Sequence, residues 1–211
     1  MLYFANPCGE STVIAAMEAG ELGFIATPDQ GNARPAGAAW CADNGCYGKG
    51  YPGDAKWLEW LRARAGDAGS CWFATAPDVV GDAAATLARS APFLPLIRSM
   101  GYPAALVAQD GLEDLEVPWA DFDVLFIGGT TEWKLGPAAA GLIREAKARG
   151  KRVHMGRVNS GRRYRLALER GCDSADGTFL TFGPAKNLPR LQVWTRQRHQ
   201  ARLFDDWETT A

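Results

Sequence analysis

The chain has 211 residues, of which 47% are hydrophobic, and its formal net charge is −1. This length and composition suit one buried core, so we expect a single domain over residues 1–211 with a frayed tail after about residue 204. No apolar run approaches the roughly 20 residues of a membrane helix, and the N-terminus lacks a signal-like pattern, which predicts a soluble, cytoplasmic protein.

The cysteines are five in number, widely spread and never spaced as C-x-x-C. This pattern predicts reduced thiols and argues against disulfides and a structural zinc site. Only His154 and His199 are available to join Cys41 and Cys46 as ligands. We therefore expect no metal and no cofactor. The full set is Cys8, Cys41, Cys46, Cys71 and Cys172.

Short apolar segments bounded by Gly, Pro, Asn and Asp recur along the chain and predict eight β-strands. They cover residues 2–6, 23–27, 39–42, 71–76, 104–108, 124–127, 152–155 and 174–175. Predicted helices cover residues 11–20, 54–64, 137–150, 160–171 and 188–202, with two short helices between 81 and 101. Residues 29–37, between the second and third strands, are too rich in turn residues for a helix.

Strands that alternate with helices predict an α/β fold, a single (β/α)8 TIM-type barrel. The barrel must be trimmed, because such folds typically take about 250 residues. An open doubly wound sheet is the alternative, although no Gly-rich phosphate-binding turn follows any strand. Ligands of parallel α/β folds gather at the carboxyl ends of strands, so Arg157 and Asp176, which end the last two strands, are expected to face one site.

A basic segment runs from residue 144 to residue 170, with ten Lys or Arg residues against two Glu residues, a net charge of +8. Such a segment could dock a polyanion, or its residues could be the solvated faces of two helices. Arg157, Arg162 and Arg163 stand apart, because they follow a strand or fall in the first turn of a helix. A cation there opposes the helix dipole, which favours a functional role.

Six strand ends together resemble, in the same order, those of the tRNA-guanine transglycosylase superfamily. That superfamily carries T-D-S-G-G-F, D-E-C, V-Q-G-G, I-G-G-L, M-G-V-G and F-D-C. This chain has A-D-N-G-C-Y at 42–47, A-P-D at 76–78, V-A-Q-D-G at 107–111, I-G-G-T at 127–130, M-G-R-V at 155–158 and A-D-G-T at 175–178. It lacks the cysteine cluster of the superfamily's zinc site, and is most similar to the compact deazapurine DNA-modification proteins of the DpdA type.

The resemblance implies a pentosyltransferase that replaces guanine in DNA with a free 7-deazaguanine base through a covalent aspartyl-sugar intermediate. Asp176 takes the position of the nucleophile and Asp43 that of the general base, roles that suit an oxocarbenium-like transition state. Asp78 would accept from the Watson–Crick edge of the base, and the Gln109 amide and the Gly129 N–H would donate to its carbonyl. The implied site residues are Asp78, Gln109, Gly128, Gly129 and Thr130 for the base, and Arg157, Arg162 and Arg163 for nucleic acid.

The chain also departs from the superfamily pattern. Gly177 and Thr178 follow the nucleophile position where the superfamily has C-V-L-P-T-R, so its arginine is lost and one of the three arginines above would replace it. Taken singly, the strand ends are also ordinary turn sequences, and His154 is expected to be a satisfied core residue. The alternatives are a catalytically silent base-binding partner subunit, a tRNA-acting transglycosylase and a glycosidase that releases guanine to water; a homodimer is left open.

Overall fold

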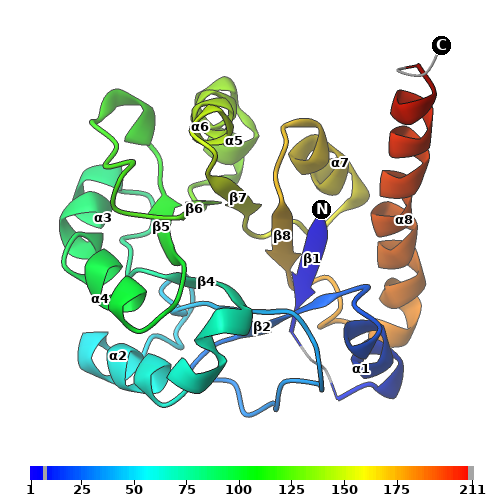
Figure 1. Ribbon diagram of the computed structural model, residues 1–211, viewed down its shortest axis with the longest axis horizontal. Helices are drawn as coiled ribbons and strands as arrows, with labels where there is room; N and C mark the ends of the chain where they lie inside the picture. The colour runs from blue at the N-terminus through cyan, green and yellow to red at the C-terminus, as the bar shows by residue number, and fades with distance from the viewer. Residues whose placement is uncertain (7–8, 209–211) are drawn as a thin grey trace.

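Eight parallel strands form one closed barrel in which β1 pairs with both β2 and β8 (Figure 1). The computed structural model describes residues 1–6 and 9–208, and the side chains of residues 1–6 and 9–196. The closed sheet confirms the predicted single, trimmed (β/α)8 barrel and excludes an open doubly wound sheet. No helix in the described ranges is long and apolar enough to cross a membrane.

The strands lie within two residues of their predicted bounds, because most are short apolar runs between turn residues. They are β1 Leu2–Ala5, β2 Gly23–Ala26, β3 Trp40–Ala42, β4 Cys71–Thr75, β5 Ala104–Ala108, β6 Val124–Ile127, β7 Arg152–Met155 and β8 Ser174–Gly177.

The helices surround the barrel, and their sequence signals account for most of their ends (Figure 1). Pro137 opens α6 at its first position, and the Ser160 hydroxyl caps α7 by accepting from the Arg163 N–H. The helices are α1 Ser11–Glu18, α2 Asp54–Arg62, α3 Ala83–Ser90, α4 Phe93–Ser99, α5 Thr131–Leu135, α6 Pro137–Ala148, α7 Gly161–Glu169 and α8 Pro184–Glu208, with 3₁₀ turns η1 Ala65–Ser70 and η2 Leu112–Asp114.

Three features of the helical layer bear on the predictions. Residues 27–39 contain no helix, as their composition predicts. Helix α5 is too short to show an apolar period, so the sequence did not predict it. Helix α8 begins before and ends after its predicted bounds and reaches Glu208, and residues 209–211 of the tail expected to fray lie outside the described residues.

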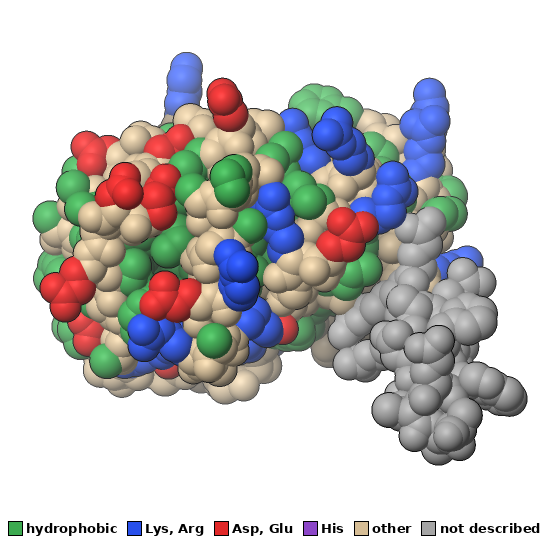
Figure 2. Space-filling model, turned by 90° about the horizontal axis from the view of Figure 1, so that it is seen from above, with side chains coloured by type: hydrophobic (Ala, Val, Ile, Leu, Met, Phe, Trp, Pro, Cys, Tyr) green, Lys and Arg blue, Asp and Glu red, His purple; other side chains and the backbone are tan. Residues whose placement is uncertain are grey.

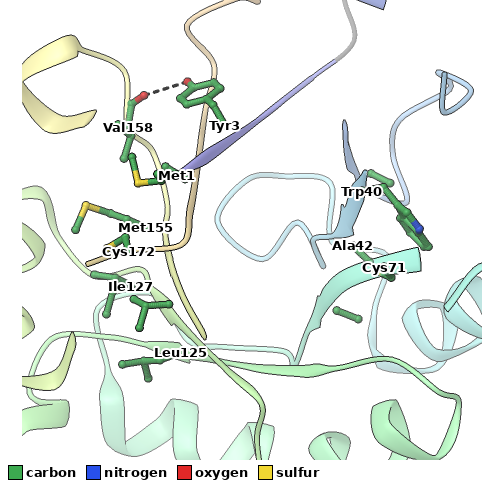
Figure 3. Close-up of a cluster of buried hydrophobic side chains, with 14 of the residues drawn as sticks. Met1, Tyr3, Trp40, Ala42, Cys71, Leu125, Ile127, Met155, Val158 and Cys172 are labelled. Atoms are coloured by element: carbon green, nitrogen blue, oxygen red, sulfur yellow. Dashed lines mark hydrogen bonds between the residues drawn. The ribbon is translucent and has the colours of Figure 1, made fainter. Parts of the chain in front are cut away.

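Side chains alternate along each strand between the inside of the barrel and the surrounding helices. In β1, Phe4 belongs to the inner cluster, and Tyr3 and Ala5 belong to the outer one, part of which Figure 3 shows. The inner cluster also contains Phe73 and Phe126, whose rings meet edge to face at 5.9 Å. This plug of aromatic rings fills the middle of the barrel, so a ligand can enter only at one of its ends.

Hydrogen bonds from two tyrosines lie near the pairing of β1 with β8 that closes the barrel. The Tyr3 hydroxyl donates to the Val158 carbonyl at 3.0 Å (Figure 3), and the Tyr164 hydroxyl donates to the Met1 carbonyl at 2.6 Å. Gly177, at the end of β8, lies against the first of these contacts. A Cβ at this position would lie 2.5 Å from the Tyr3 hydroxyl and 2.9 Å from the Val158 carbonyl oxygen.

We expect Gly177→Ala to lower the free energy of unfolding by about 1–3 kcal/mol, because the added methyl group must displace a buried tyrosine and a backbone carbonyl. Gly141→Ala in α6 is the matched control, since the nearest atom to its Cβ would be at 4.0 Å and alanine favours a helix. Urea denaturation of both variants checks this. An unchanged midpoint for Gly177→Ala would contradict it.

Candidate functional site

A cavity of about 590 Å³ lies at the carboxyl ends of the strands. Every strand contributes to its lining through residues at or just after its end, and Ile25, Val107 and Phe126 of the inner cluster form its floor. This size falls in the range of small-molecule sites. The charged residues of the lining are Asp29, Lys49, Asp43, Asp78, Arg157 and Asp176.

Asp176 is the most firmly held of these side chains. It is 8% exposed; its Oδ1 accepts from the Arg157 backbone N–H at 2.7 Å, and its Oδ2 lies 3.1 Å from His154 Nε2. Burial alone would raise the pKa of Asp176, but the His154 ring, the Arg157 N–H and the Lys134 charge outweigh it and hold the pKa below its ordinary value. The carboxylate is therefore ionised at neutral pH.

His154 supports Asp176 from inside the barrel. Its Nδ1 lies 2.9 Å from Ser174 Oγ, and its ring is fully buried. Because an ionised carboxylate can only accept, Nε2 carries a proton and donates to Asp176. His154 is the satisfied core residue that the sequence predicts, but its contact with Asp176 was missed. The signal was present, since Ser174 and Asp176 are two residues apart and so face the same side of β8. The centre of the His154 ring lies 6.1 Å from that of Phe4, 4.8 Å from that of Phe73 and 4.5 Å from that of Phe126.

Arg157 adopts a left-handed backbone conformation, with φ of 58°, which among the described residues is otherwise confined to glycines. Its side chain turns across the site. The guanidinium donates to the carbonyls of Gly128 and Gly129 and lies 4.1 Å from the centre of the Tyr47 ring. These contacts compensate for the backbone strain, and they also mean that this cation holds loops of the site together.

Lys134 holds the loop that follows β7 and was not predicted from the sequence as a site residue. It is fully buried on α5, and its Nζ donates to the Gly156 carbonyl at 2.6 Å. Burial, and secondly the charge of Arg157, lower the pKa of Lys134 to about 7. The sequence around it, T-E-W-K-L, resembles an exposed helix and carries no signal of burial.

Asp43 stands at the end of β3, half-buried at the edge of the cavity. Its Oδ1 accepts from the Gly45 N–H at 2.7 Å in a tight turn. Burial, followed by the charge of Asp176, raises the pKa of Asp43 to about 7. The two carboxylates predicted to do the chemistry thus line one cavity, and their pKa values move in opposite directions.

Asp78 and Gln109 form the opposite side of the site. Asp78 Oδ2 accepts from Gln109 Nε2 at 2.7 Å, and Asp78 Oδ1 accepts from Asn44 Nδ2 at 3.3 Å. Burial raises the pKa of Asp78, an effect that the Asn44 and Gln109 hydrogen bonds partly offset. Sequence analysis did not predict Asn44 as a site residue. It is 2% exposed, and its amide also donates to the Ala76 carbonyl at 2.8 Å.

The structure corrects the expected hydrogen bonding of Gln109 and Gly129. Gln109 Oε1 accepts from the N–H groups of Gly81 and Gly129, each at 3.0 Å. The Gly129 N–H is therefore occupied within the protein, where the sequence predicts that it donates to a base carbonyl. Gln109 orients Asp78 and keeps only its second amide hydrogen for another partner.

The cavity does not gather every predicted site residue. Gly128 lines it, and a side chain there would meet Val107 Cγ1 at 2.8 Å, which explains the glycine. Gly129 and Thr130 are not part of the lining. Thr130 is exposed, and its N–H and hydroxyl donate to Asp110 at 2.7 and 2.6 Å, so it fixes the start of α5.

Several cations of the basic segment, residues 144–170, make contacts within the protein. Lys147 pairs with Asp173 at 2.8 Å, and Arg170 donates to the carbonyls of Lys134 and Leu135. In Figure 2, most Lys and Arg side chains lie at the centre and right of the face and most Asp and Glu at the left. Arg163 Nη1 contacts the Arg157 carbonyl at 3.4 Å, whereas Arg162 is exposed and has no partner in the described part of the chain.

No three His, Cys, Asp or Glu side chains in the described ranges are grouped to hold a metal ion. Cys41, Cys46, Cys71 and Cys172 are free thiols, and Cys41, Cys71 and Cys172 are buried. Cys8 and the side chain of His199 lie outside the described residues.

No family model and no curated protein matches the chain. It is similar to the solved structure of 3-hexulose-6-phosphate synthase from Salmonella typhimurium, with a TM-score of 0.50 and 15% sequence identity over 93% of this chain and 98% of that chain. It is also similar to the Amycolatopsis orientalis BexX/CysO complex, with a TM-score of 0.45 and 14% identity over 96% of this chain and 89% of that chain. At these identities the likeness concerns the fold alone.

We expect His154→Leu to lower the free energy of unfolding at pH 7 by about 2–4 kcal/mol, because it leaves Oδ2 of a buried carboxylate without its donor. The loss should shrink toward about pH 5. His154 is the largest of the causes that lower the pKa of Asp176, so we expect its removal to let burial raise this pKa and the variant's carboxyl group to take up a proton at acid pH.

Ser174→Ala is the matched control, since it removes one hydrogen bond and keeps the contact between His154 and Asp176. It should cost about 1 kcal/mol. Urea denaturation at both pH values compares the two variants with wild type. A destabilisation by His154→Leu that does not change with pH would mean that Asp176 does not depend on this histidine.

Proposed function

We propose that this chain is a base-exchange transglycosylase that replaces guanine in DNA with a 7-deazaguanine base through a covalent bond between Asp176 and the sugar. The observation that carries the proposal is the pair of carboxylates in one cavity. The pKa of Asp176 is held below its ordinary value and that of Asp43 is raised to about 7. Carboxyl groups whose pKa values are pushed apart in this way divide nucleophilic and proton-transfer roles.

In the first step, the Asp176 carboxylate attacks C1′ of the target nucleotide. The C1′–N9 bond breaks, its electron pair stays on the departing guanine, and Asp43 gives a proton to N9. In the second step, the incoming base gives its N9 proton to the Asp43 carboxylate, N9 attacks C1′, and the C1′–O bond to Asp176 breaks. Two displacements at the same carbon retain its configuration, as in retaining glycosidases.

In this proposal Asp78 recognises the base, and Gln109 and Asn44 hold Asp78 in place. A carboxylate can accept from the N1–H and the exocyclic amine of a guanine-like edge. Gln109 and Asn44 fix the orientation of Asp78, and the apolar floor at Val107 and Phe126 suits a planar ring. The free amide hydrogen of Gln109 is available for the base carbonyl.

The polymer is assigned from the resemblance to the DpdA-type proteins. A cavity at a barrel rim admits only an unstacked base, so the target guanine is flipped out of a duplex or lies in a single strand. The exposed Arg162 beside this rim suits a flanking phosphate.

We expect wild-type protein to incorporate labelled guanine or a 7-deazaguanine into DNA hairpins. Asp176→Asn should abolish exchange, by about 10³-fold or more, and Asp43→Asn should slow it by about 10²–10⁴-fold. Asp29→Asn is the matched control, an exposed carboxylate of the same cavity that the chemistry does not use. Scintillation counting and nucleoside mass spectrometry measure the products.

Other results of this assay assign other functions. Exchange into RNA alone identifies a tRNA-acting transglycosylase, and abasic sites without an incoming base identify a glycosidase. Binding of guanine that is unaffected by Asp176→Asn, with no turnover on any polymer, identifies a silent partner subunit. Absence of exchange from both polymers, with no Asp176–sugar adduct, would end the proposal.

The pH dependence follows from Asp43. Release of guanine needs its protonated form, whose fraction falls as pH rises through the raised pKa of about 7. We expect the single-turnover rate of guanine release to be flat below about pH 6 and to fall about tenfold per pH unit above about pH 8. Asp176 stays ionised across this range because its pKa is lowered. Rapid-quench measurements check the profile, which should flatten in Asp43→Asn; a flat wild-type profile would remove Asp43 from the proton transfer.

A further inference from the structure

We infer that a second cavity, on the flank of the barrel, binds a nucleotide of the strand that carries the target base, beside the nucleotide that enters the main cavity. This inference rests on the proposed function. The flank cavity has a volume of about 230 Å³ and shares Thr27 with the main cavity. Its walls include Trp40, Trp60, Arg34 and Arg64.

The flank cavity exists because the helical layer is interrupted. Residues 27–39, between β2 and β3, form a loop where a (β/α)8 barrel has a helix. Phe24, Ala26 and Trp40 of these strands therefore face a hollow between this loop and the α2–η1 segment. The loop also divides the two cavities, since Asp29 lines the main one and Gln30 lines the flank one. A nucleic-acid strand that crosses this loop would pass from one cavity to the other.

The chemistry of the flank cavity combines flat aromatic faces with cations. The Arg64 guanidinium lies 4.0 Å from the centre of the Trp60 ring, and that of Arg34 lies 5.4 Å from the centre of the Trp40 ring. Trp60 is itself stacked on Trp57 at 5.3 Å with an interplanar angle of 18°. Because Trp57 and Arg64 both lie against the Trp60 ring, the surface offered to a base is the Arg64 guanidinium, which Trp60 supports. Proteins bind single-stranded nucleic acid by stacking bases on aromatic rings and arginine planes and by attracting phosphates to arginines.

Charge favours this division between the cavities. The main cavity is lined by four carboxylates and two cations, so it repels a phosphate group. The flank cavity is lined by two arginines and one carboxylate, Asp67. Arg34 pairs with Asp67 at 3.3 Å and donates to Ser70 at 3.0 Å, which gives it a structural role. Arg64 is exposed and Trp60 half-buried, so these two residues are the ones that meet the nucleotide.

The test measures binding of a fluorescein-labelled, nine-nucleotide single-stranded DNA with a central guanine by fluorescence anisotropy. We expect Arg64→Gln and Trp60→Leu each to weaken binding by about tenfold. Between about 50 and 200 mM salt, Arg64→Gln should also flatten the salt dependence by about one charge, and Trp60→Leu should leave it unchanged. Arg62→Gln is the matched control, because Arg62 is an exposed arginine two residues before Arg64, at the end of α2, and does not line the cavity.

Uptake of free guanine, measured by equilibrium dialysis, should be unchanged in all three variants, which separates the flank cavity from the main one. Urea midpoints establish that both variants are folded, because Arg64 also donates to the Trp60 carbonyl at 3.2 Å and lies over the Trp60 ring. Binding of the DNA by both variants as tightly as by wild type overturns the inference even where base exchange occurs. Selective loss of DNA binding with no base exchange by wild type supports the flank cavity and instead overturns the proposed function. A wild type that neither binds this DNA nor exchanges bases overturns both.

Discussion

The site depends on the ionised carboxylate of Asp176 in a largely buried position. An unpaired charge there costs several kcal/mol, so each oxygen must have a donor. The Arg157 N–H serves one oxygen and His154 the other. To aim its N–H at Asp176, Arg157 takes the left-handed conformation, and to present Nε2, His154 occupies the aromatic plug where an apolar residue would pack. Two local irregularities of the barrel thus have one electrostatic cause.

The hydrogen bonds that hold the site residues in place form two groups on opposite sides of the cavity. One joins the ends of β6, β7 and β8 through Arg157 and Lys134, and the other joins the ends of β3, β4 and β5 through Asn44 and Gln109. The Gly129 N–H, which donates to Gln109, connects them. Burial, then the charge of Asp176 and, less strongly, that of Asp78 raise the pKa of Asp43, so this pKa depends on carboxylates from both groups.

The sequence was sufficient for the barrel and for the residues that strand ends bring together. Parallel strands place their carboxyl ends on one rim, so Asp43, Asp78, Gln109, Arg157 and Asp176 could be predicted to meet. The supporting residues could not be predicted in the same way. Strand β7 alone does not show that His154 faces the inside of the barrel, and only the two-residue spacing of Ser174 and Asp176 on β8 indicates its partners. Lys134 lies on the five-residue helix α5, whose sequence carries no signal of burial. The engagement of the Gly129 N–H is a backbone contact, which residue types do not reveal.

The loop between β2 and β3 shows how a trimmed barrel can gain surface by losing a helix. Removal of a helix exposes the outer side chains of two strands, and burial elsewhere must compensate. Here Trp40 remains 3% exposed, because the loop and the α2–η1 segment cover it, and the hollow that is left is lined by arginines. Carboxylates therefore concentrate in the main cavity and cations beside it. A nucleotide has the complementary arrangement, with neutral base and sugar at one end and an anionic phosphate at the other, and this complementarity is the reason for proposing that its base and C1′ occupy the acidic cavity with the phosphate outside.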